Sequence, residues 1–227
     1  MRACAARLTL AIDRNEASKA LSQISVMKYV GGVFRPGSEF ATPPAELVKL
    51  PGFGKDINAA RAEAKQLLKE AGVPEGFSFV LKNRNVKEPY EVSGVYVVDQ
   101  WRKIGLNVTH MPLEGGPYFN DLRQEISTRA SISTARFMDE PDLYLLKYLS
   151  SRSSAVNYAR YNDATLDELY ERQSRMLDLK ERFADLSGKW KGAPSASKLI
   201  NSRCSGGSGL CRTAAGSRAG KSARATT

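Results

Sequence analysis

The chain has 227 residues, a hydrophobic content of 42% and a formal net charge of +10. This length and composition can bury one sizeable core, and no run of about 20 apolar residues is present to span a membrane. Residues 184–227 hold eight of the 34 basic residues and one of the 24 acidic residues, so the preceding 183 residues carry a net charge of only +3. Because the excess charge gathers in a tail, we do not expect nucleic acid as a partner.

A helix is predicted directly after the loop LPGFGKD at residues 50–56. Asp56 is suited to cap its N-terminus, and Gly72 and Pro74 are suited to end it. Apolar residues recur at helical spacing on one face: Ala60, Ala64, Leu67, Leu68 and Ala71. The glycines of the loop lack the spacing and the Gly-Lys-Ser/Thr ending of a phosphate-binding loop, so a plain turn is favoured.

Two strands joined by a second helix follow. Residues 76–85 alternate Phe77, Phe79 and Leu81 with smaller or polar residues, as in a half-buried strand. Residues 89–103 are rich in valine but form a run too long for a typical strand of about 5 to 6 residues, so we predict a helix, with Trp101 packed on the sheet. Residues 106–110 alternate again. This βαβ pattern is usually parallel and predicts an α/β fold.

The C-terminal part of the chain differs in kind. After Ile200 it consists almost wholly of small, polar and basic residues, which bury too little apolar surface to offset the entropy of ordering them, so we expect disorder from residue 184 to residue 227. Two of the three cysteines, Cys204 and Cys211, lie in this tail, and Cys4 lies near the other end. With one histidine in the chain and no CxxC, they indicate neither a metal site nor a disulfide framework, and no cofactor is expected.

Several segments together resemble the family 5 extracellular solute-binding proteins, the peptide-, nickel- and oligosaccharide-binding components of ABC importers. These segments are RLTLAIDR (7–14), LPGFGKD (50–56) with ARAEAKQLLKEAG (60–72), VVDQWRKIGLNVT (97–109), FMDEPDLYLLKYLSS (137–151) and NYARYNDATLDELYERQSRMLD (157–178). Their order and spacing are more specific than any single motif.

The resemblance implies a periplasmic-binding-protein-like lobe, with a mixed sheet flanked by helices. Residues 7–183 would form part of the C-terminal lobe, and residues 184–227 a low-complexity tail. We expect the preceding lobe and its signal peptide to be absent from this chain. The family is periplasmic or attached to the cell surface, and its partners are a peptide or other small solute and the membrane subunits of the transporter.

The resemblance also implies where a solute lies. In peptide-binding members an aspartate before a helix pairs with the α-amino group of the ligand, and alignment on Pro141 places Phe137 at that position, so this anchor is missing. Asp139 lies two residues away and replaces it only if the backbone shifts. The residues expected to face the solute are Ser131, Thr134, Ala135, Phe137, Asp139 and Asn157. We expect no catalytic activity.

Other interpretations of the same residues remain open. Asp139, Glu140 and Asp142 are consistent with the carboxylates of a hydrolase, although acidic residues around Pro141 are more typical of a helix N-terminus. His110 has no partner at the spacing of a catalytic triad and is interpreted as structural. Tyr144, Tyr148, Tyr158 and Tyr161 are suited either to an aromatic cleft wall or to a core-facing helix. The basic tail leaves nucleic-acid binding as a further alternative.

Overall fold

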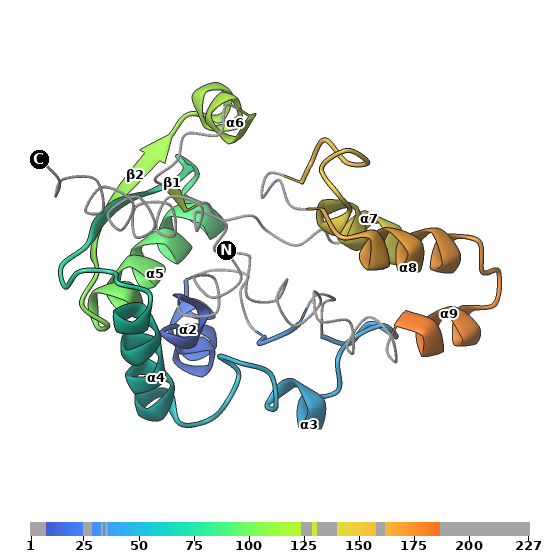
Figure 1. Ribbon diagram of the computed structural model, residues 1–227, viewed down its shortest axis with the longest axis horizontal. Helices are drawn as coiled ribbons and strands as arrows, with labels where there is room; N and C mark the ends of the chain where they lie inside the picture. The colour runs from blue at the N-terminus through green and yellow to red at the C-terminus, as the bar shows by residue number, and fades with distance from the viewer. Residues whose placement is uncertain are drawn as a thin grey trace, which may run out of the picture.

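The computed structural model describes residues 8–24, 29–32, 34, 36–123, 129–130, 140–157 and 162–186. Figure 1 shows a small sheet surrounded by helices, which we call the sheet group, and a set of helices to one side of it, which we call the helical group. The sheet group comprises α2 (Arg14–Leu21), α4 (Ile57–Glu70), β1 (Ser78–Arg84), the turn η1 (Lys87–Glu91), α5 (Val92–Arg102), β2 (Asn107–Leu113), α6 (Gly115–Arg123) and β3 (Arg129–Ala130). The helical group comprises α7 (Pro141–Leu145), η2 (Leu146–Tyr148), α8 (Ala164–Ser174) and α9 (Leu179–Asp185).

The described strands are arranged in the order β2-β1-β3, and both pairings are parallel. Phe79 lies opposite Val108 and Leu81 lies opposite His110, so the two predicted strands are in register along their whole length. The crossover from β1 to β2 runs through α5, which confirms the βαβ unit and the α/β class. No antiparallel strand of the expected mixed sheet occurs within the described residues.

The helix predicted after Asp56 is confirmed as α4. The Asp56 carboxylate accepts hydrogen bonds from the backbone N–H groups of Asn58 and Ala59, each at 3.0 Å. Ala64 and Leu68 are buried, as the predicted apolar face requires, while most of the charged face stays exposed. The sequence signals at this helix therefore give both its limits and its orientation.

The second predicted helix forms. Glu88 has extended backbone angles (φ −116°, ψ 135°), as expected before a proline, and it is the only residue of η1 with non-helical angles. Helical angles therefore start at Pro89, as predicted, and the regular α-helix α5 begins at Val92. The valines adopt helix in spite of their preference for strands because α5 packs along β1 and β2.

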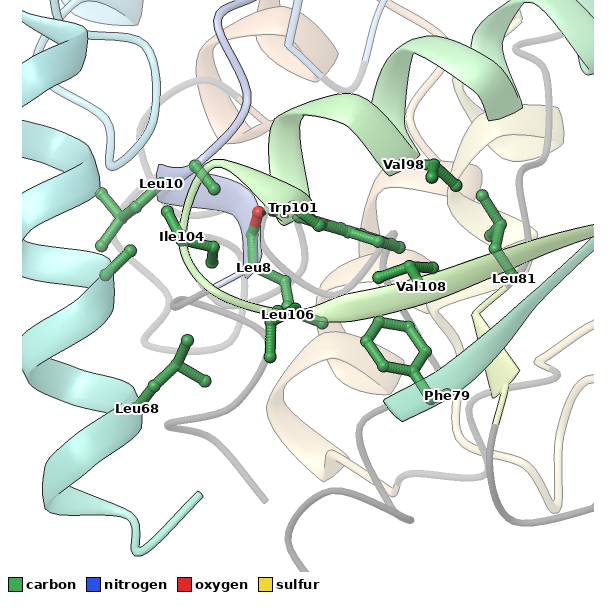
Figure 2. Close-up of a cluster of buried hydrophobic side chains, with 12 residues drawn as sticks. Leu8, Leu10, Leu68, Phe79, Leu81, Val98, Trp101, Ile104, Leu106 and Val108 are labelled. Carbon is green, nitrogen blue, oxygen red and sulfur yellow. Dashed lines mark hydrogen bonds between the residues drawn. The ribbon is translucent and has the colours of Figure 1, made fainter. Parts of the chain in front are cut away.

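The core of the sheet group lies between α5, α4 and one face of the sheet (Figure 2). Trp101 is 1% exposed, its ring lies 5.5 Å from that of Phe79, and its indole N–H donates to the carbonyl of Leu8 at 3.0 Å. The predicted packing of Trp101 on the sheet is therefore confirmed. The buried cluster is completed by Leu10, Ala11, Ala64, Leu68, Leu81, Val98, Ile104, Leu106 and Val108.

Three of the segments that carry the resemblance meet at one place. The Arg14 guanidinium donates to the carbonyls of Thr9 (3.0 Å) and Gly52 (2.5 Å) and lies 4.4 Å from the ring centre of Phe53. On the other side, the amide oxygen of Gln100 accepts from the backbone N–H of Asp13 at 3.1 Å. These residues hold the N-terminal segment against α5 and the loop before α4, so the motifs have a structural role here.

The connection between α2 and α4 contains the short helix α3 (Pro44–Leu47). Phe34 and Phe40 pack together there, with their ring centres 5.7 Å apart. The expected boundary between residues 183 and 184 falls inside α9, where Asp185 and the following Leu186 are both buried. The expectation of disorder concerns residues that lie mostly outside the described part of the chain.

Candidate functional site

A ligand is expected at the end of the sheet where the parallel strands have their carboxyl ends. We call this end of the sheet its carboxyl edge. β1 ends at Arg84, which pairs with Leu113 at the end of β2, so both strands end at the same edge. β3 pairs with the middle of β1 through Leu81 and Ala130, and Ser131 is the next residue in the chain. Open α/β sheets bind ligands outside the carboxyl ends of their strands, which makes this edge the candidate site.

Most of the predicted solute-facing residues lie outside the described residues. Ser131, Thr134, Ala135, Phe137 and Asp139 fall in the segment 131–139, which the structure does not describe. Their role at the site therefore stays a prediction.

Asn157 is described, and it lies in the helical group. It is 2% exposed, and its side-chain amide donates to the carbonyl of Leu149 at 2.8 Å. In the same loop, the Ser154 hydroxyl donates to the carbonyl of Leu146 at 2.7 Å. These hydrogen bonds satisfy two backbone carbonyl groups in and directly after η2. Asn157 therefore has a structural role in addition to its predicted contact with the solute.

The described acidic residues near Pro141 are held by Arg182. Glu140 caps α7 by accepting from the backbone N–H of Asp142 at 3.4 Å, and it also accepts from the Arg182 guanidinium at 2.6 Å. Asp142 accepts from Arg182 at 3.1 Å and from the side-chain amide of Gln173. This arrangement favours the capping interpretation over a pair of catalytic carboxylates, which would need to converge on a substrate rather than on an arginine.

Of the four tyrosines, the structure describes the side chain of Tyr148 alone. Tyr148 is 5% exposed and so belongs to the interior of the helical group. The side chain of Tyr144 and the whole of Tyr158 and Tyr161 lie outside what the structure describes. Burial therefore favours packing for Tyr148, and the roles of the other three stay predictions.

His110 lies on β2 and faces α5. A Cβ atom added to Gly94 would come within 2.3 Å of the His110 Nε2 and 2.7 Å of the Asn83 amide nitrogen, so helix and strand approach closely at this glycine. Burial lowers the pKa of His110, and the charge of Glu91 opposes this shift. The His110 Nε2 is buried and has no hydrogen-bond partner among the described atoms.

One cluster at the candidate edge was not foreseen from the sequence. The Arg84 guanidinium carbon lies 4.8 Å from the ring centre of Tyr90 on η1 and 5.7 Å from that of Phe119 on α6. Its guanidinium also donates to the Tyr90 hydroxyl at 3.2 Å. The only sequence signal was an arginine at the end of an alternating strand, and the two aromatic residues lie 6 and 35 positions away from it.

In the described part of the chain, no helix combines the length and apolar character needed to cross a bilayer. Within it, no three His, Cys, Asp or Glu side chains are arranged to hold a metal ion.

Comparison with known proteins identifies the family. The profile described as "Bacterial extracellular solute-binding proteins, family 5 Middle" matches residues 8–157. The di/tripeptide-binding protein 1 of Pseudomonas aeruginosa strain UCBPP-PA14 is 27% identical over 179 residues, which cover 75% of this chain and 33% of that protein. The dipeptide-binding protein of P. aeruginosa PAO1 is 26% identical over 133 residues, 56% of this chain and 25% of that protein.

Solved structures show the same fold. A putative peptide binding protein AppA from Clostridium difficile superposes with a TM-score of 0.68 at 19% identity, covering 90% of this chain and 39% of that one. The murein tripeptide binding protein MppA of Escherichia coli gives a TM-score of 0.66 at 18% identity, covering 90% and 38%. The chain thus spans about a third of the length of the relatives it matches, and it belongs to the bacterial extracellular solute-binding proteins of family 5.

Proposed function

We propose that this chain supplies one wall of the substrate-binding component of an ABC importer. The component captures a peptide-like or other small solute between two lobes and presents it to the membrane subunits of the transporter. The observation that carries the proposal is the family match over residues 8–157, which includes the whole βαβ unit. The peptide-binding relatives and the dipeptide binding protein from Pseudoalteromonas sp. SM9913 in complex with Met-Leu (TM-score 0.65) support it.

We further propose that residues 7–186 act as part of the C-terminal lobe, in the periplasm or attached to the cell surface, and that the residues after them form a separate tail. The solute lies at the carboxyl edge of β1 and β2 and contacts the segment 131–139. With Phe137 at the position of the family aspartate, recognition of a free α-amino group is weakened, because a buried charge-assisted bond is lost. Binding drives closure of the two lobes about a hinge.

The hydrolase alternative receives no support from the described acidic residues. The carboxylates of Glu140 and Asp142 share the Arg182 guanidinium, so both are bound by a cation and neither is placed beside a second free acid within the described region.

A calorimetric titration of the 227-residue chain with di- and tripeptides and with oligosaccharides tests the proposal. Because closure needs two walls, we expect no saturable binding tighter than roughly millimolar. Micromolar binding by this chain alone would contradict a site shared between lobes. Turnover of any ester, amide or glycoside that is lost in the Glu140→Gln variant would restore the enzyme alternative.

A further inference from the structure

β2 is the last strand on one side of the sheet, so its backbone decides whether another strand can be added there. It stands first in the order β2-β1-β3, and in the described ranges of the chain it pairs with β1 alone. The last strand of a sheet presents backbone N–H and C=O groups that can serve as a template for pairing with another chain. We call the side of β2 that faces away from β1 its outer side.

Two hydrogen bonds show which residues of β2 face outward. The Asn107 N–H donates to the carbonyl of Phe77 at 3.0 Å. At the other end of the strand, the Leu113 carbonyl accepts from the N–H of Asn85 at 2.6 Å, so both residues point their backbone groups toward β1. In a parallel strand the N–H and C=O of one residue point to the same side, and the side alternates from residue to residue. The outer side therefore carries the backbone groups of the even-numbered residues of β2, which are Val108, His110 and Pro112.

Two of these outer groups are withdrawn from pairing. The Arg102 guanidinium, at the end of α5, donates to the carbonyl of Val108 at 2.9 Å, so this acceptor is satisfied from within the chain. Pro112 has no N–H, so the strand lacks a donor at its third outer position. Arg102 and Pro112 are both exposed, so neither residue is needed to fill the core.

The two features act on the same hydrogen bond. The β2 strands of two copies can lie antiparallel about a twofold axis at His110, since a twofold interface uses the same surface on both copies. In that register His110 faces His110 of the second copy and Pro112 faces Val108 of the second copy, and each opposed pair would exchange two hydrogen bonds. The donor that Pro112 lacks is the one that would meet the Val108 carbonyl, and Arg102 already occupies that carbonyl. The twofold axis repeats this loss on the other side of the interface.

We propose that Arg102 and Pro112 together close the outer side of β2 and keep this chain from joining a second copy through that strand. The missing donor weakens the pairing, and the arginine satisfies the acceptor that the missing donor would otherwise leave without a partner. The two residues are therefore complementary, and neither closes the strand alone. The closed strand is independent of the solute, so its failure would leave the proposed function unchanged, and failure of the proposed function would leave the closed strand unchanged.

Sedimentation equilibrium of the 227-residue chain and of the variants Arg102→Ala, Pro112→Val and Arg102→Ala/Pro112→Val tests this proposal. Valine restores the donor and suits a strand, and alanine frees the carbonyl, so only the double variant regains both missing hydrogen bonds of the twofold pairing. We expect its dimer dissociation constant to be about thirtyfold lower than that of the unchanged chain. Each single variant should change this constant by less than about threefold.

The double variant Lys103→Ala/Pro74→Val is the matched control. It removes one basic residue and one proline as the test variant does, but Lys103 pairs with Asp99 on α5 and Pro74 is exposed in the loop between α4 and β1. We expect this control to associate as the unchanged chain does. Amide hydrogen exchange locates the contact: the protection of the His110 N–H should rise with protein concentration in Arg102→Ala/Pro112→Val and in none of the other proteins.

Three results would overturn the closed strand. The first is protection of the His110 N–H that rises with concentration in the unchanged chain, because β2 would then pair in spite of Arg102 and Pro112. The second is a double variant that associates no more tightly than Lys103→Ala/Pro74→Val. The third is a double effect equal to the sum of the two single effects, because the two residues would then not act on one hydrogen bond.

Discussion

The sheet group and the helical group are stabilised in different ways. In the sheet group, Trp101, Leu81 and Val108 are almost completely buried, and the interior is closed by apolar contacts (Figure 2). In the helical group, Arg182 and Asp185 are themselves buried, at 8% and 7% exposure, and each takes part in ion pairs. Apolar burial depends on shape and area, whereas buried ion pairs depend on every partner being present.

This difference predicts how each group responds to change. The stability of the sheet group should be insensitive to salt but sensitive to substitutions that shorten a buried side chain. This is because its main stabilising contribution is the removal of apolar surface from water. The helical group should be sensitive to the loss of a single charge, since that leaves the partner unpaired. The ion pairs of Arg182 join residues 42 and 40 positions apart, so they have no local sequence signal.

The largest effect is expected from Trp101→Ala. Removing this ring leaves a cavity beside Phe79 and frees the Leu8 carbonyl from its buried hydrogen bond, so the free energy of unfolding should fall by about 3 to 5 kcal/mol. Urea unfolding followed by circular dichroism measures it. Val95→Ala on the same helix is the control, because Val95 is 62% exposed and its loss should cost no more than about 0.5 kcal/mol. Equal effects would contradict the assigned core.

Arg182→Met should destabilise the helical group by about 2 kcal/mol, less than a fully buried pair, because Glu140 and Asp142 are 46% and 35% exposed and can regain water. The matched control is Arg175→Met, whose exposed pair with Glu171 contributes about 0 to 0.5 kcal/mol. Amide hydrogen exchange should show the loss confined to α7, α8 and α9. An unchanged exchange rate in these helices would mean that the network does not hold them together.

Gly94→Ala tests the close approach of α5 to the sheet. The added methyl group would meet the His110 ring and the buried amide of Asn83, so we expect a loss of about 1 to 2 kcal/mol although alanine is the better helix former. Gly115→Ala is the control, since an added Cβ there has no atom within 4 Å. A stabilised Gly94→Ala protein would show that the contact relaxes without cost.

The smallest effect concerns pH. Because burial lowers the pKa of His110 in the folded state, the unfolded chain binds more protons as the pH falls through about 6.5, and stability should decrease in that direction. His110→Gln should reduce the difference between the free energies of unfolding at pH 7.5 and pH 5.5. If the wild-type protein instead gained stability toward pH 5.5, and His110→Gln removed that gain, the attraction of Glu91 would outweigh burial. The pKa of His110 would then be raised rather than lowered by folding.

Local signals in the sequence predicted the sheet group well. The cap at Asp56, the alternation of Phe77, Phe79 and Leu81, and the βαβ order are properties of neighbouring residues, and all of them appear in the structure. The helical angles that start at Pro89 were predicted too, because a proline suits a first helical turn and keeps the residue before it extended.

The candidate site was less predictable. The Arg84 cluster joins the end of β1, the turn η1 and α6, and no spacing rule connects an arginine with aromatic residues on two later elements. The acidic residues near Pro141 were rightly favoured as a cap, but their partner Arg182 lies on α9 and carried no signal. The six predicted solute-facing residues came from the family resemblance alone, and five of them lie outside the described residues.

The central claim is that this chain forms one wall of a solute site that is completed by a second lobe. The most direct measurement replaces the matching segment of the P. aeruginosa di/tripeptide-binding protein 1 with residues 8–186 and compares, by calorimetry, solute affinities of the folded chimera and of the isolated chain. We expect the chimera to bind its solute at least about a hundredfold more tightly than the isolated chain does. Equal affinities for the two proteins would contradict it.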